Sequence, residues 1–118
     1  MANLSQSDLD QFTGTDQWHK HFTGLLYTDG VKYMAETAGA YWLLDAIGSY
    51  QRQLNKNERL AEFQLWKLEV IESRGLLTCR ADSNEKPVIS QEIEYTDFCL
   101  ESIKLYVEGG VLLLPSEH

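Results

Sequence analysis

The chemistry open to this chain depends on a few polar residues beside apolar segments, and Asp45 is the most unusual of them. It directly follows the dense apolar run at 41–44. A buried carboxylate costs free energy unless it is hydrogen-bonded or paired. If the fold buries Asp45, an arginine such as Arg52 or Arg80, or a tyrosine hydroxyl, must satisfy it. Its pKa would then be shifted, as in many catalytic and ligand-binding carboxylates. A solvated or structurally paired Asp45 is the alternative and needs no ligand.

Three more residues complete a candidate polar site with Asp45: Asp29, Arg80 and His19. Asp29 belongs to the segment 27–30, which fits either an active-site turn or the start of a helix. The helix start needs no further partner, because Thr28 or Asp29 can cap a free backbone N–H. Arg80 and Asp82 share one face of a predicted strand, where they would pair with each other or flank a site.

His19 and His21 invite interpretation as metal ligands. Two residues apart on a helix, they would point to nearly opposite sides, and the local pattern is helical. The cysteines, Cys79 and Cys99, have no metal-ligand spacing and stand among apolar residues, which is typical of inert thiols. The sequence contains no phosphate loop, nucleophile elbow, zinc-protease motif or C-x-x-C. We therefore expect no metal, no cofactor and no catalytic residue.

Helical signals fill the first half of the chain. A short helix is predicted over 8–12, capped by Ser5 or Ser7, and another from Asp16, in which Trp18 and Phe22 are four residues apart. The main helical segment follows Thr28 and ends at 55–57. Gly39 divides it, so that it forms either two helices, about 30–37 and 39–54, or one bent helix.

The second half has the two-residue period of strands. Strands are predicted over 63–71, 76–81, 88–95, 103–107 and 111–114, with turns at 73–75 and at the glycine pair 109–110. This order predicts an α+β fold in which two or three N-terminal helices pack on one face of a four- to five-stranded antiparallel meander sheet. We expect a single domain over 1–118, with a helical part at 1–57 and a sheet part at 61–115.

The charge is concentrated in the second half. The 118 residues carry a net charge of −8; residues 1–60 hold five Lys/Arg against seven Asp/Glu, and residues 61–118 hold five against eleven. Binding to nucleic acid draws its affinity from neutralised phosphates, so no direct nucleic-acid binding is expected. The acidic half would meet a basic protein, mimic nucleic acid, or only keep the chain in solution. No membrane span and no export signal are visible, which predicts a cytoplasmic protein.

The chain has more large aromatic residues than one small interface between helices and sheet requires. Exposed aromatic side chains mark interaction surfaces. The candidates are Trp18, Tyr33, Trp42 and Trp66. We therefore expect a small acidic protein–protein interaction module that binds another protein or forms a homo-oligomer. The alternatives are a small enzyme or ligand-binding domain with a pocket around Asp45, and an inhibitor that mimics nucleic acid.

Four blocks of sequence carry a resemblance to a known family: FTGTDQW at 12–18, LLYTDGVKYMAE at 25–36, AYWLLDAIGSYQ at 40–51 and VLLLPSE at 111–117. They resemble the recurring blocks of an uncharacterised family of small proteins from bacteria and their mobile elements, catalogued as a domain of unknown function. The resemblance spans nearly the whole chain. It implies a single stand-alone bacterial domain, and it implies no activity, substrate or site residue.

Overall fold

The computed structural model describes residues 4–118 and combines helices with one mixed sheet. The first half forms α1 (Gln6–Asp10), β1 (Trp18–Lys20), β2 (Leu26–Thr28), α2 (Asp29–Ala38), α3 (Tyr41–Leu54) and α4 (Glu58–Glu62). The second half forms β3 (Phe63–Ile71), β4 (Arg74–Arg80), β5 (Ile89–Ile93), β6 (Ser102–Glu108), β7 (Val111–Leu113) and the 3₁₀ helix η1 (Pro115–Glu117). The described residues include no helix that is long and apolar enough to cross a bilayer.

The sheet has seven strands in the order β1-β2-β7-β6-β3-β4-β5. The mixed α+β architecture is confirmed, but the predicted four or five strands and the purely antiparallel pairing are wrong. The first half of the chain supplies the hairpin β1–β2, and β2 pairs in parallel with β7 through Leu26 opposite Val111 and Tyr27 opposite Leu112. The sequence therefore does not separate into a helical part and a sheet part.

The predicted helix from Asp16 is wrong, because residues 18–20 form β1. The four-residue spacing of Trp18 and Phe22 suits a helix, but this segment instead pairs with β2, with His19 opposite Tyr27. Pairing partners outside the local sequence override such a weak local preference. The change matters for the site, because the side chains of His19 and His21 now fall on the same side of the chain.

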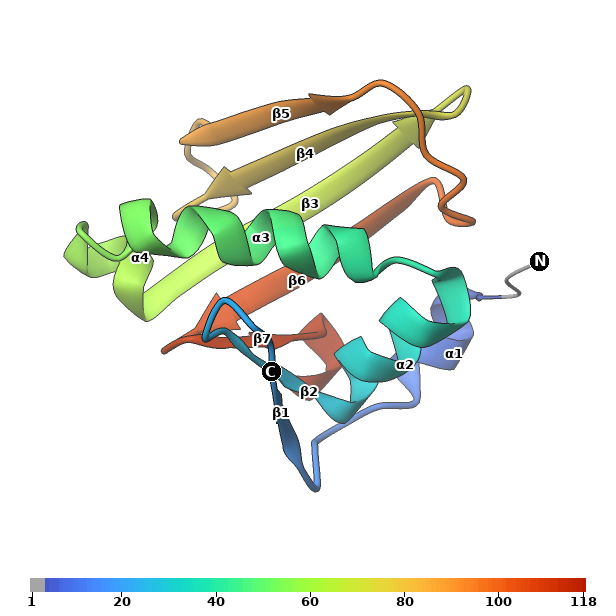
Figure 1. Cartoon of the computed structure of the whole chain (residues 1–118), viewed down its shortest axis with the longest axis horizontal. Helices are drawn as coiled ribbons and strands as arrows, with labels where there is room; N and C mark the ends of the chain where they lie inside the picture. Colours follow the sequence, from blue (N-terminus) through green and yellow to red (C-terminus); the bar gives the residue numbers. More distant parts are fainter. Residues whose placement is uncertain (1–3) are drawn as a thin grey trace.

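Gly39 does end one helix before the next begins. Its φ of +62° is left-handed, and its N–H donates to the carbonyl of Ala35 at the end of α2. Glycine adopts this conformation without the strain that a Cβ would bring. Of the two alternatives left open for this segment, two helices or one bent helix, the structure shows two helices. The second helix, α3, lies across the sheet in front of β3 and β6 (Figure 1).

The core lies between α3 and the inner face of the sheet. Leu43, Leu44 and Ile47 of α3 are fully buried there, as are Trp66 of β3 and Cys79 of β4. The three- and four-residue spacing in α3 and the alternation in β3 were both visible in the sequence.

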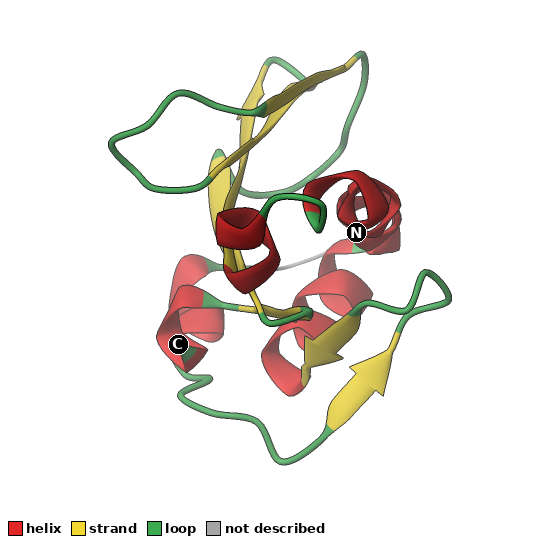
Figure 2. Ribbon diagram, turned by 90° about the vertical axis from the view of Figure 1, so that its left-hand side faces the viewer, coloured by secondary structure: helices red, strands yellow, loops and turns green. Residues whose placement is uncertain are grey.

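The C-terminal end of the chain lies on the face of the sheet opposite α3. Figure 2 shows the sheet nearly edge-on, with α3 on one side and the C-terminal end on the other. His118 packs there against the rings of Phe63 and Tyr106, which lie on the outer face of β3 and β6. The part of the outer face formed by β3, β4 and β5 near the β3–β4 turn remains uncovered.

Candidate functional site

Two histidine–aspartate pairs join β1 and its following turn to the helices. His19 Nε2 lies 2.8 Å from Asp29 Oδ1, and His21 Nε2 lies 2.7 Å from Asp45 Oδ1. Carboxylates only accept hydrogen bonds when ionised, so each imidazole donates through Nε2–H. The structure therefore brings His19 and Asp29 of the candidate polar site together, and places Asp45 with His21 instead. Arg80 lies apart from both pairs, on β4 opposite Leu65.

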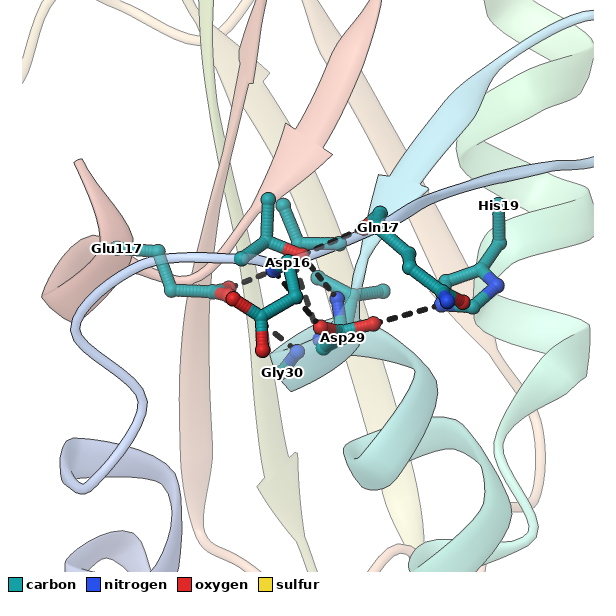
Figure 3. A network of polar contacts seen from close by, with 9 residues as sticks. Asp16, Gln17, His19, Asp29, Gly30 and Glu117 are labelled. Carbon is teal, nitrogen blue, oxygen red and sulfur yellow. Dashed lines mark hydrogen bonds and ion pairs between the residues drawn. The ribbon is translucent and has the colours of Figure 1, made fainter.

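Asp29 stands at the N-terminus of α2, where free backbone N–H groups favour negative charge. Its carboxylate accepts from His19 and from the backbone N–H of Asp16 at 3.0 Å, and its own N–H donates to Thr15 Oγ1 at 2.9 Å (Figure 3). The pKa of Asp29 is lowered below its usual 3.8. The largest cause is the hydrogen bond from His19, and the second is the hydrogen bond from the N–H of Asp16. The predicted helix start in the segment 27–30 is confirmed. Of the two candidate caps, Thr28 and Asp29, it is Thr28 whose Oγ1 accepts from the N–H of Val31.

Glu117, from the other end of the chain, completes the network at this helix start. Its carboxylate accepts from the hydroxyl of Thr28 at 2.6 Å, from the N–H of Leu114 at 3.0 Å and from the N–H of Gly30 at 3.3 Å. A Cβ on Gly30 would lie 2.7 Å from both Glu117 Oε1 and Leu114 Cδ1, so any other residue there would require the side chains of Glu117 and Leu114 to move. Sequence reasoning missed Glu117, because no periodicity links it to a helix start 87 residues earlier.

His21 is held on both sides of its ring. Nδ1 accepts from the N–H of Thr23 at 3.2 Å and lies 2.8 Å from Thr23 Oγ1, while Nε2 donates to Asp45. A hydroxyl, an imidazole and a carboxylate thus stand in the order of a catalytic triad. The hydroxyl of Thr23, however, packs against Gly48 of α3, where any Cβ would collide with it. This chain of contacts fastens the β1–β2 turn to α3.

Of the alternatives left open for Asp45, the structure shows the structurally paired carboxylate and not the buried one. Its side chain is 53% exposed, whereas the imidazole of His21 that it contacts is almost fully buried. The helical period explains this, since Leu43, Leu44 and Ile47 take the buried face and leave Asp45 at its border. No arginine is needed to satisfy it. Within residues 4–118, no group of three or more His, Cys, Asp or Glu is placed to hold a metal ion.

The four candidate interface aromatics have different surroundings. Trp18 and Tyr33 are exposed, and Trp42 is half-buried. Trp66 is completely buried, and its indole N–H donates to Gln64 Oε1 at 2.8 Å. Trp66 is therefore part of the core and is not available to a partner.

The uncovered end of the outer face is hollowed. A groove of about 670 Å³ lies there, which we call the hairpin groove, and it is lined by Glu69, Ile71, Arg74, Gly75, Leu76, Glu92, Ile93 and Glu94. Ile71 and Leu76 expose apolar surface in it, with side chains that are 71% and 38% exposed. A second hollow beside it shares Glu69 and Ile71 and adds Glu72 and Glu101. None of the residues of the candidate polar site lines either hollow.

These features define a class: a small α+β domain on a seven-stranded mixed sheet, with a polar network at the start of α2 and an uncovered groove. The chain belongs to the family described as "Family of unknown function (DUF6876)", whose model matches residues 3–118. The membership in an uncharacterised family that the sequence blocks implied is thereby confirmed. No curated protein and no solved structure matched the chain. The origin in bacteria and mobile elements stays a prediction.

Proposed function

We propose that this protein is an interaction module that binds a basic segment of another protein at the hairpin groove. The observation that supports the proposal is the exposure of Ile71 and Leu76 inside a rim of glutamates, on a part of the sheet that no helix of the described residues covers. An apolar centre with a charged rim is the usual anatomy of a protein interface.

The charge of the rim indicates the chemistry of the partner. Glu69 is already paired with Lys67, at 3.3 Å. Glu92 and Glu94 line the groove with Arg74 as its cation, and the neighbouring hollow adds two more glutamates. Lysine or arginine side chains would be attracted to this rim, and complementary charge speeds association and selects partners. An acidic partner or a nucleic acid would be repelled.

The alternative of a ligand pocket around Asp45 receives less support. Its carboxylate is bonded to His21 and half exposed, and neither hollow described above reaches it. Mimicry of nucleic acid would require the rim charges to contribute most of the binding free energy. The exposed apolar centre at Ile71 instead favours a mixed apolar and basic partner.

Fluorescence anisotropy with labelled peptides tests the proposal. The probes are a peptide of mixed lysine and valine, and the same peptide with glutamate in place of lysine. We expect binding of the lysine peptide only, weakened by the double variant Glu92→Lys/Glu94→Lys and by Ile71→Ser, each about tenfold or more. The matched control is Glu36→Lys/Glu62→Lys, which makes the same change in net charge at exposed helical positions. Equal binding by both double variants would mean that the groove is not the binding surface.

A further inference from the structure

We propose that the basic partner segment binds in an extended conformation, as an eighth strand along the free edge of β5. This inference rests on the proposed function and specifies how the partner binds beside the groove, whose rim includes Glu92 of β5 and Glu94 just after it. β5 is the edge strand of the sheet, and within residues 4–118 it pairs only with β4. Its other edge therefore presents backbone N–H and C=O groups without a strand partner, which an extended peptide can satisfy.

The side chains of β5 determine which strand fits. Glu92 stands opposite Leu76 on the outer face, and Ser90 stands opposite Thr78. Ile89, Gln91 and Ile93 alternate with these two residues along the strand and point to the side of the sheet that α3 covers. A strand beside β5 would place alternate residues next to the glutamates and the others next to the isoleucines. The partner should therefore alternate basic and apolar residues.

The edge of β5 has few of the features that normally block pairing. Pro87 lies before the strand, and no proline or left-handed residue interrupts Ile89–Ile93. The ends carry exposed apolar residues instead, since Val88 is 52% exposed and Tyr95 is 72% exposed. The edge of β5 is therefore protected against pairing mainly by its negative charge. This charge discriminates between partners instead of excluding all of them.

The same charge argues against a second copy of this chain on β5. Two antiparallel β5 strands would bring Glu92 and Glu94 of one copy close to those of the other, and like charges across a strand pair are destabilising. A basic strand meets no such repulsion. The other free edge of the sheet, β1, contributes only three residues, with Lys20 as its cation.

The test uses ¹⁵N-labelled full-length protein and an extended peptide of roughly nine alternating lysine and valine residues. We expect shifted resonances and about tenfold or more slower amide exchange within Ile89–Ile93 on binding. A second peptide carries N-methyl groups at every central residue, which keeps the charges and removes the N–H donors. It should bind about tenfold or more weakly. Peptides that are N-methylated only at the lysines or only at the valines control for the methyl groups. Each of them keeps the N–H donors on one edge of the strand. At least one of them should therefore keep its affinity.

The outcomes separate the two proposals. An amphipathic helical peptide with the same number of lysines serves as a further probe. If this helix binds and Glu92→Lys/Glu94→Lys weakens it while the extended peptide does not bind, strand addition is overturned and the proposed function stands. Full affinity of the completely methylated peptide would also overturn strand addition. If neither peptide binds, both proposals fail. Self-association that Lys20→Glu abolishes, seen by light scattering, would replace the foreign partner with a second copy.

Discussion

At the scale of single residues, the most informative feature is the use of the chain's own carboxylates at the start of α2. The N-terminus of a helix attracts anions. Here Asp29 occupies that position from within the helix, and Glu117 occupies it from the C-terminal end of the chain. The place where a phosphate or another anion would bind is thus already filled, which makes this network a structural junction.

The ionisation of Asp29 should contribute to the pH dependence of stability. Its folded pKa is lowered, mainly by His19, so its contribution is fully present above the unfolded pKa of about 4 and is lost as the pH falls through the folded value. We expect Asp29→Asn to lower the free energy of unfolding at pH 7 and to differ progressively less from the wild type at lower pH. Urea unfolding between about pH 2 and pH 7 measures this.

Asp97→Asn, at an exposed carboxylate, is the control and should leave the profile unchanged. His19→Gln should make the acid transition begin at a higher pH, because the main cause of the lowered pKa is removed. A stability difference for Asp29→Asn that stays constant over the whole range would show that its role does not depend on charge.

The sequence could predict only the local half of this junction. Thr28 as a cap follows from residue type and position. Glu117 and the pairing of His21 with Asp45 depend on contacts between residues far apart in the chain, 89 and 24 positions respectively. Whether Asp45 is buried stayed open in the sequence, because the border of a helical face could not be located without knowing what covers that face.

At the scale of elements, the two tight hairpins differ in how well their sequences suit them. The β6–β7 turn uses Gly109 and Gly110 at φ of +55° and +85°. The β3–β4 turn places Glu72 and Ser73 at φ of +50° and +66°, between the paired residues Ile71 and Arg74. Left-handed conformations cost free energy for residues with a Cβ, and Asn-Gly suits such two-residue turns best.

Replacing Glu72-Ser73 with Asn-Gly should therefore stabilise the protein by about 1 kcal/mol. The reverse exchange, Gly109-Gly110 to Glu-Ser, should destabilise it by a similar amount or more. Thermal unfolding of both variants measures the effect. A lower Tm for the Asn-Gly variant would mean that the side chains of Glu72 or Ser73 make a contribution that outweighs their backbone strain.

The sequence predicted the glycine turn correctly and misplaced the other by including Arg74 and Gly75, which belong to β4. The strand β3 was correct from Phe63 to Ile71, because nine alternating residues leave little ambiguity. The prediction for the segment 18–20 was wrong because three residues are too few to show a period. The helix α4 was missed because its five residues are also too few.

At the scale of the whole molecule, a buried pair of amides joins the helices to the sheet. Gln51 of α3 and Gln64 of β3 exchange two hydrogen bonds of 2.8 Å. Gln64 also accepts from the indole of Trp66 and donates to the carbonyl of Leu60 in α4, and Gln51 donates to the carbonyl of Ile47. Every amide atom is satisfied, so the network fixes how α3, α4 and β3 fit together.

Removing one amide should leave the other without its partner. We expect Gln64→Leu to cost about 3 kcal/mol and Gln51→Leu about 2 kcal/mol, because each leaves buried polar groups unsatisfied. The double variant should cost clearly less than the sum, since both partners are then apolar. Urea denaturation of the four proteins provides the comparison. Strict additivity would show that the two amides do not act as a pair.

The position of β7 has a consequence for how the protein is made. Among the described residues β7 is the last strand in chain order, yet it lies between β2 and β6 in the sheet. Until residues 111–113 have left the ribosome, the hairpin β1–β2 has no neighbour to join, and the start of α2 lacks Glu117. The nascent chain must therefore carry β2 without its β7 neighbour while all the residues between them are made. Slow translation just before residues 111–113 should prolong that exposed state and increase aggregation.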